Sequence, residues 1–141
     1  MGLFSREIHE NDWFDTLKLD KNFSIHILPA RHYSGRTLTH NKTLWASYAL
    51  EIPAHKIYLD GDSGYGSHFK QIAAQLGGFD IVMLDSGQYD PRWPLIHMTP
   101  EEVVQAAQDL NAKNMLPMHI GRFALSTHAW NEPFKRVAQA S

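Results

Sequence analysis

The hydrophobic residues of this chain change their spacing near residue 61, and this change limits the folds open to it. Residues 23–29 alternate between apolar and polar side chains, as a half-buried strand does. Residues 43–52 and 56–60 are two further strand candidates, which a turn at 53–55 joins into a hairpin. From Phe69 to Leu76 the apolar side chains instead follow helical spacing. The chain therefore begins with strands and continues with helices.

The second part of the chain alternates strands with helices. Residues 79–84 form a short apolar run typical of a buried strand, and residues 115–118 form a last short strand. Thr99–Glu102 predicts a helix start, with a threonine N-cap, a proline in the first turn and acids near the positive end of the helix. Residues 131–139 predict a final helix. The order is an antiparallel hairpin followed by β-α-β-α-β-α, an α/β layer whose second part pairs in parallel.

The overall composition excludes several classes of protein. A chain of 141 residues with 43% hydrophobic residues suits one domain with a real core. A net charge of -2 without a basic run argues against a nucleic-acid partner, and no apolar stretch is long enough for a transmembrane segment. The start at Met1–Arg6 fits neither a signal peptide nor a myristoylation pattern. The absence of cysteine excludes disulfides and cysteine-bound metals, and a cytoplasmic location is expected.

Nine histidines are many for this length, and three potential metal ligands stand where predicted strands end. His32 follows the strand at 23–29, Asp62 follows the strand at 56–60, and His119 follows the last strand. Ligands collect at the carboxyl ends of strands in open α/β folds, and imidazole with carboxylate suits zinc, iron or manganese. Taken singly, a lone histidine is usually a surface residue and an aspartate in a glycine-containing turn is ordinary. Spacing alone leaves both interpretations open.

The string Gly61–Gly64 also resembles the nucleophile region of chymotrypsin-like serine proteases. That interpretation is rejected, because the chain is too short for two β-barrels and Tyr65 follows where a glycine would be needed. Ser63 is better explained as a turn hydroxyl or as a hydroxyl that supports a neighbouring group.

Six strings, in their order and spacing, resemble the second half of the N-acyl-phosphatidylethanolamine-hydrolysing phospholipase D group of the metallo-β-lactamase superfamily. They are Pro29–Ser34 with Arg36–Leu38, Leu44–Ser47, Gly61–Tyr65, Tyr89–Trp93, His97–Glu102 and Met118–Leu125. The resemblance runs from about Trp13 to Pro133. It implies that residues 1–141 are the C-terminal half of one αββα sandwich domain.

The resemblance also implies roles for single residues. His32 is similar to a histidine of the first metal site, Asp62 to the carboxylate that bridges two metals, and His119 to a histidine of the second site. Asp60 has the same strand parity as Asp62, and only the motif selects between them. His97 is similar to a catalytic histidine that contacts the scissile phosphate or the leaving group.

Three further residues are expected to bind substrate at the mouth of the site. Tyr89, Arg92 and Trp93 belong to one string, and the resemblance places them beside His97. Arg92 has an alternative role, an ion pair with Asp90 or with Glu101, and both interpretations stay open.

By resemblance, the protein is a metal-dependent hydrolase, a phosphodiesterase or phospholipase-D-like enzyme that acts on a small phosphodiester or a lipid-like substrate. Its complete site would hold two zinc ions, or iron or manganese, and these would activate a hydroxide. Two alternatives are a sugar-phosphate lactonase-like hydrolase and a non-catalytic half-domain that acts in assembly.

The leading motif of the superfamily, HxHxDH, does not occur in this sequence. In the family it lies in the first half of the domain, so little activity is expected of this chain alone. One sheet face, with Leu44, Trp45 and Tyr48, would then lack its partner, which predicts a homo-oligomer or association with the missing N-terminal half. Two smaller departures are Ile120–Arg122, where the family commonly has Trp-Gly-Thr, and Asp85, which stands where a proline or a small residue is more usual.

Overall fold

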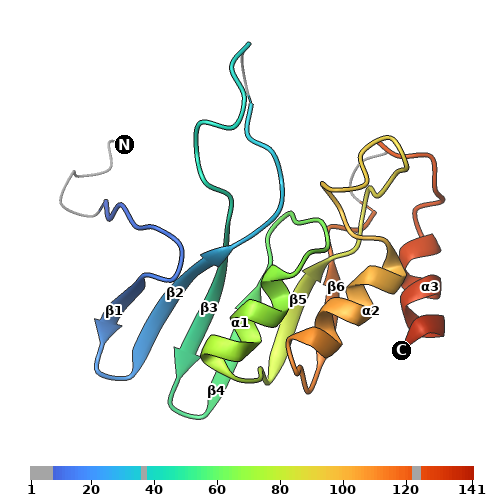
Figure 1. Ribbon diagram of the computed structural model, residues 1–141. Coiled ribbons are helices and arrows are strands. Elements are labelled where there is room, and N and C mark those ends of the chain that lie inside the picture. Colours follow the sequence, from blue (N-terminus) through green and yellow to red (C-terminus); the bar gives the residue numbers. More distant parts are fainter. Residues whose placement is uncertain (1–7, 36–37, 122–124) are drawn as a thin grey trace.

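The computed structural model describes residues 8–35, 38–121 and 125–141, which form a six-stranded sheet and three helices (Figure 1). The elements in chain order are β1 (Thr16–Asp20), β2 (Phe23–Pro29), β3 (Ala46–Ile52), β4 (His55–Leu59), α1 (His68–Leu76), β5 (Ile81–Asp85), α2 (Pro100–Asp109), β6 (Met115–Met118) and α3 (Glu132–Ala140). Of the residues named above, Met1–Arg6, Arg36 and Thr37, and Arg122–Ala124 lie outside the described residues.

The sheet confirms the predicted α/β class. Its strand order follows the sequence from β1 to β6, with antiparallel pairing up to β4 and parallel pairing of β4, β5 and β6. Strand β1 was not predicted, because four of its five residues are exposed and it carries no buried apolar face. Strand β3 begins at Ala46, three residues later than the sequence indicated.

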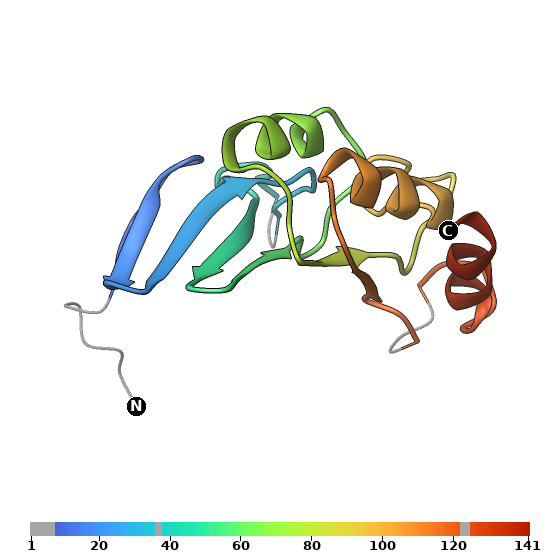
Figure 2. The ribbon, with the colours of Figure 1, turned by 90° about the horizontal axis from the view of Figure 1, so that it is seen from below.

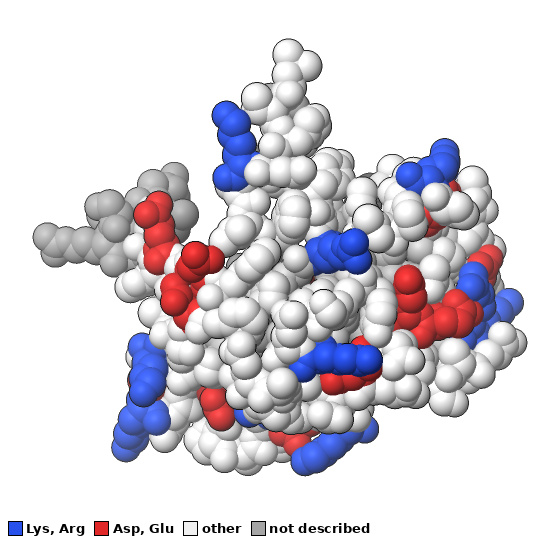
Figure 3. Space-filling model, in the orientation of Figure 1, with Lys and Arg blue, Asp and Glu red and all other residues white. Residues whose placement is uncertain are grey.

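Helices α1 and α2 cover one face of the sheet (Figure 2). Fully buried side chains from the strands, such as Tyr58 and Val82, meet Phe69 of α1 and Val103 of α2 there. Helix α2 begins with the predicted Thr99 N-cap, which forms a capping box with Glu102. On the face seen in Figure 3, acidic and basic side chains are interspersed. None of the three described helices is long and apolar enough to cross a membrane.

Helices α1 and α2 leave the other face of the sheet uncovered (Figure 2), and apolar side chains are exposed on it. Tyr48 and Ile81 remain 43% and 40% exposed although they adjoin the buried Ala49 and Val82, and Leu116 is 47% exposed. A hollow of about 680 Å³ lies over the antiparallel strands, lined by side chains that include Ile25, Ile27, Leu44, Tyr48 and Leu50. Leu44 and Tyr48 are thus exposed as expected, whereas Trp45 is half-buried.

Four strands end at the same edge of the sheet. Strand β2 is antiparallel to β3, and β3 is antiparallel to β4, so β2 runs in the direction shared by β4, β5 and β6. The loops that follow these four strands therefore gather at one edge (Figure 1). The candidate metal-binding and catalytic side chains lie at this edge.

Candidate metal centre

Asp62 and His119 come together at this edge. The His119 imidazole lies with Nε2 3.9 Å from Oδ1 of Asp62, and both side chains are partly exposed. His119 directly follows β6 and has a positive φ of 60°, a conformation that non-glycine residues adopt mainly where the surroundings enforce it. A hydrogen bond to Asp85 is the main cause that raises the pKa of His119.

His97 and His32 extend this group into a row of three imidazoles. The ring centroid of His97 lies 5.0 Å from that of His119 and 5.4 Å from that of His32. His97 comes from the long loop between β5 and α2, and His32 from the loop after β2. The predicted residues His32, Asp62, His97 and His119 thus form one continuous cluster.

Each of the three imidazoles is held at Nδ1 by an oxygen. His32 Nδ1 lies 2.8 Å from the carbonyl oxygen of Tyr33, and His97 Nδ1 lies 2.6 Å from a carboxylate oxygen of Asp85. His119 Nδ1 lies 3.3 Å from the other oxygen of Asp85. A carbonyl oxygen only accepts, so Nδ1 of His32 donates the proton, and an ionised Asp85 imposes the same on the other two. A neutral ring held in this way keeps a lone pair on Nε2, the atom that can bind a metal.

The sequence indicated Asp85 only as a departure from the family pattern and did not predict that its side chain lies at the site. It ends β5 at the same edge, is completely buried and contacts both His97 and His119. Burial acts to raise the pKa of Asp85, but the hydrogen bonds from His119 and His97 bring it below its ordinary value. A carboxylate directly after a parallel strand was the signal that could have identified it.

Asp60 and Asp62, which have the same strand parity, have different surroundings. Asp60 is buried, accepts the hydroxyl of Tyr58 at 3.1 Å and lies with its second oxygen 3.5 Å from the backbone nitrogen of Asp85. Burial, and then the charge of Asp85, raise the pKa of Asp60 well above its ordinary value. Asp62 is half-exposed and lies beside His119. Ser63 is a buried loop residue whose hydroxyl donates to the carbonyl of Gly64.

Arg92 and Trp93 lie beside His97, but Arg92 is already paired. Its guanidinium contacts both carboxylate oxygens of Asp90, at 2.8 and 2.7 Å, and lies 4.7 Å from the centre of the Trp93 ring. Asp90 is therefore its partner, while Glu101 pairs with Arg136 instead. A largely apolar hollow of about 460 Å³ opens here, lined by Tyr33, Gln88, Arg92, Trp93, Ile96, His97 and Leu125.

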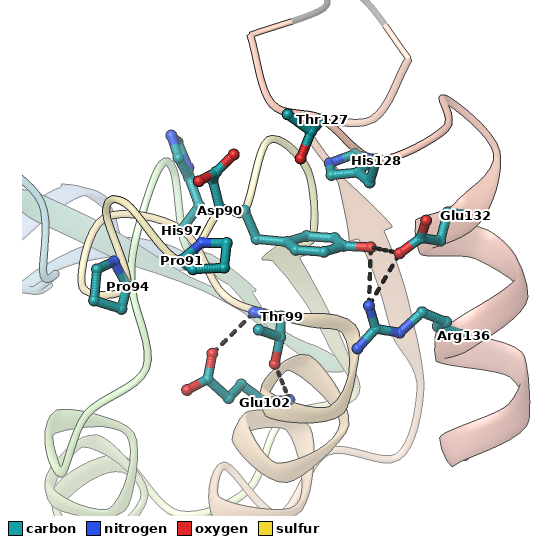
Figure 4. A pocket seen from close by; sticks show the side chains of 11 residues that line it. Asp90, Pro91, Pro94, His97, Thr99, Glu102, Thr127, His128, Glu132 and Arg136 are labelled. Carbon is teal, nitrogen blue, oxygen red and sulfur yellow. Dashed lines mark hydrogen bonds and ion pairs between the residues drawn. The ribbon is translucent and has the colours of Figure 1, made fainter.

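Tyr89 lines a different hollow, between the loop and α3 (Figure 4). Its hydroxyl donates to Glu132 at 2.7 Å, and His128 stacks on its ring with the centroids 4.2 Å apart. Burial, then the bond to Glu132, raises the pKa of Tyr89 to about 12. This hollow of about 490 Å³ also reaches His97. The three residues expected at one mouth are thus divided between two hollows that share His97.

The donor set fits a divalent transition metal. One ring nitrogen of His97 and one of His119 lie within 4.8 Å of each other and of a carboxylate oxygen of Asp85, and Asp62 adjoins His119. Imidazole nitrogens combined with carboxylate oxygens are the ligands of zinc, iron and manganese in proteins. The chain offers no thiolate, which would favour copper(I) or an iron–sulfur cluster.

Curated relatives match most of the chain. RomA of Klebsiella pneumoniae, described as an outer membrane protein, is 54% identical over 99 residues, which are 70% of this chain and 75% of RomA. An uncharacterised protein of Mycobacterium tuberculosis is 42% identical over 99% of this chain and 38% of its own length. The mitochondrial N-acyl-phosphatidylethanolamine-hydrolyzing phospholipase D of Saccharomyces cerevisiae is 37% identical over 91% of this chain and 29% of its own length.

Solved structures share the fold. Igni18, a metallo hydrolase of Ignicoccus hospitalis, superimposes with a TM-score of 0.70 at 22% identity, over 92% of this chain and 52% of its own. The metallo-β-lactamase fold protein YhfI of Bacillus subtilis gives a TM-score of 0.67 at 16% identity, over 92% of this chain and 48% of its own. The chain therefore spans about half of these structures and less than two fifths of the mycobacterial and yeast relatives.

A family model confirms the relationship over most of the chain. The model described as Beta-lactamase superfamily domain matches residues 3–120, from before β1 to the residue after His119. The match includes the four strand ends that carry the cluster of histidines and aspartates. With this match and the 54% identical relative, the chain belongs to the metallo-β-lactamase superfamily.

Proposed function

We propose that this chain carries one side of the active site of a metal-dependent hydrolase that cleaves phosphodiesters, in the manner of a phospholipase D. One observation carries the proposal. Three imidazoles at a single sheet edge are each held at Nδ1 and keep Nε2 for another partner, and Asp62 adjoins one of them. Superfamily membership supports hydrolysis as the reaction class.

His32, Asp62 and His119 would hold the metal, with Asp62 shared between two zinc, iron or manganese ions. Bound divalent metal would polarise the phosphoryl oxygens and supply a water molecule of lowered pKa. Because Asp62 is half-exposed and makes its contact with His119 at 3.9 Å, it can approach an ion without breaking a buried hydrogen bond. These three residues thus provide both nitrogen and oxygen ligands.

His97 would act on the proton of the reaction. Its Nδ1–H is held by Asp85 at 2.6 Å, so its Nε2 can accept a proton and then return it. In the step proposed, the water oxygen bonds to phosphorus while the bond from phosphorus to the leaving oxygen breaks. The proton that the water gives up passes to Nε2 of His97 and from there to the leaving oxygen.

The apolar hollow beside His97 suits a lipid-like substrate. Trp93, Ile96 and Leu125 line it, and Arg92 is neutralised by Asp90 there. The yeast relative, and one from Caenorhabditis elegans that is 32% identical, are both described as N-acyl-phosphatidylethanolamine-hydrolyzing phospholipases D. A hydrocarbon chain in this hollow would bring its phosphodiester to His97. A cytoplasmic location remains part of the proposal.

Metal content tests the proposal directly. We expect the purified chain to bind zinc, and Asp62→Ala and His119→Ala to lose most of it, as measured by elemental analysis after dialysis. His55→Ala is the matched control, because His55 is an exposed histidine at the start of β4, away from this edge. A wild-type chain that retains no zinc, or equal retention by all four proteins, would contradict the proposal.

The open sheet face would bind the remaining half of the fold. A sheet with an apolar face needs a second layer, and Igni18 and YhfI contain about as much chain again beyond the region that matches. A second copy of this chain is the alternative occupant. We therefore propose that the partner is a polypeptide equivalent to that other half, which would also complete the metal site.

Co-expression with the part of the mycobacterial relative outside the matched 143 residues tests this interface. We expect the two polypeptides to co-elute and to hydrolyse bis-p-nitrophenyl phosphate, while this chain alone shows little turnover. Tyr48→Lys on the open face should separate them, whereas Lys70→Glu, exposed on α1, should not. A chain that remains monomeric at tens of micromolar with the added half present, or a homodimer that Tyr48→Lys disrupts, would refute this choice of occupant.

A further inference from the structure

Asp85 is a buried acid whose two oxygens reach two different histidines. Its side chain has no exposed surface, yet one oxygen lies 2.6 Å from Nδ1 of His97 and the other lies 3.3 Å from Nδ1 of His119. His97 belongs to the β5–α2 loop, and His119 follows β6. One carboxylate thus joins the β5–α2 loop to the loop after β6.

The hydrogen bonds of Asp85 use its whole accepting capacity. Oδ2 receives Nδ1–H of His97 and also the backbone N–H of Ser63 at 3.2 Å. Oδ1 receives Nδ1–H of His119 and also the backbone N–H of Gly87 at 3.1 Å. An ionised carboxylate has about four lone-pair sites. Four nitrogen atoms surround these sites at 2.6–3.3 Å, so a cation there would have to displace one of them.

We propose that Asp85 is a positioning residue that orients His97 and His119 together, and that it is not itself a metal ligand. It keeps the proton of each ring on Nδ1 and leaves Nε2 of each ring for the site. The inference rests on the proposed function only in assigning Nε2 of His119 to a metal. A carboxylate that holds the far side of a metal-binding histidine is common in metal sites, and its loss typically costs 10–100-fold in metal affinity.

The geometry that fixes Asp85 comes from backbone groups on both sides. Gly87 can approach because it lacks a side chain, since a Cβ there would lie 1.7 Å from the carbonyl oxygen of His119. The N–H of Ser63 reaches Asp85 from the loop after β4. Asp85 therefore takes its position from backbone groups of the two loops. The two rings are preset by one group, and a change in that group should disturb both.

The alternative is that Asp85 binds the metal together with His97 and His119, whose donor atoms lie within 4.8 Å of its own. The two accounts differ in the metal-free protein. If Asp85 is a ligand, the histidine tautomers are free to vary until metal arrives. If Asp85 positions the rings, both rings carry their proton on Nδ1 beforehand.

Two-bond nitrogen–proton NMR reports which ring nitrogen of each histidine carries the proton. Applied to the metal-free full chain at mildly alkaline pH, where the rings are neutral, it separates these accounts. We expect the His97 and His119 signals, assigned by their loss in His97→Gln and His119→Gln, to show the Nδ1–H form. Asp85→Asn should change the tautomer of at least one ring, because the amide NH2 of the new side chain would face an N–H group that now donates to the carboxylate. Asp109→Asn, a mostly buried acid on α2, should change neither. Mixed tautomers in the wild-type chain would overturn the proposal even if Asp85→Asn fails to fold.

Cobalt(II) binding supplies an independent measurement. We expect Asp85→Asn to bind cobalt about 10–100-fold more weakly, with the visible bands and the stoichiometry of the wild type retained. Bands that change as they do in His119→Ala would make Asp85 a ligand and refute the proposal. If the wild-type chain binds no cobalt, the proposed hydrolase site fails, but the NMR experiment still decides the role of Asp85.

Discussion

His68 offers a prediction whose size can be worked out from the structure. It is the first residue of α1, where its ring packs against Phe69 with the centroids 4.1 Å apart, and its Nε2 lies 3.5 Å from the hydroxyl of Ser63. Burial, and then the positive charge of Arg31, lower the pKa of His68 from 6.5 to about 4. The unfolded chain binds this proton more readily than the folded chain. Folding stability is therefore complete above pH 6.5 and is lost as the pH falls toward 4.

The full shift corresponds to about 3 kcal/mol, because one pKa unit is worth about 1.4 kcal/mol. Solvent near a half-buried ring reduces this to about 2 kcal/mol. Between pH 7.5 and pH 4.5, the free energy of unfolding of the wild type should fall by about 2 kcal/mol more than that of His68→Gln. Urea unfolding followed by tryptophan fluorescence measures both proteins, and other titrating groups cancel in the comparison. His55→Gln, at an exposed position, should behave as the wild type. Equal losses in the wild type and His68→Gln would refute the reasoning.

Three other substitutions probe the fold and the site. Thr99→Ala removes the hydroxyl that accepts the Glu102 N–H and should cost about 1 kcal/mol in thermal unfolding, whereas an unchanged melting temperature would contradict the cap. Phe69→Ala empties a fully buried position and should cost about 3–5 kcal/mol in urea unfolding, far more than Phe69→Leu; similar losses would argue against tight packing. Gly87→Ala places a Cβ 1.7 Å from the His119 carbonyl oxygen and should weaken cobalt binding about tenfold or more with the circular dichroism retained; unaltered binding would show that the loop can shift.

The sequence predicted most of the fold because its local signals agree with one another. Thr99 and Glu102 form the capping box at the start of α2, and strands β2 and β6 occupy the expected residues. Strand β1 carried no such signal, since its apolar residues, Leu17 and Leu19, face a surface that is open here. Edge strands without a buried face depend on pairing with a neighbour, which sequence periodicity does not report.

The site was predictable in part. His32, Asp62 and His119 share the property of following a strand, and parallel strands bring such residues to one edge. Asp85 has the same property, but its partners are nitrogen atoms from three separate loops. The approach of Ser63, His97 and His119 to this one carboxylate depends on how the loops close, and no spacing along the chain encodes it.

Three acids at the edge differ in what surrounds them, and this difference assigns their chemistry. Asp60 is buried with two neighbouring donors, and burial favours its neutral form. Asp85 is equally buried but receives four N–H groups, two of them from histidine rings, which stabilise its charge. Only Asp62 is half-exposed, with His119 as a neighbour. A cation that reaches this edge therefore meets one negative charge in the open and a second behind two imidazoles. Positive charge is thus drawn to the Nε2 side of the rings, where Asp62 can complete its coordination.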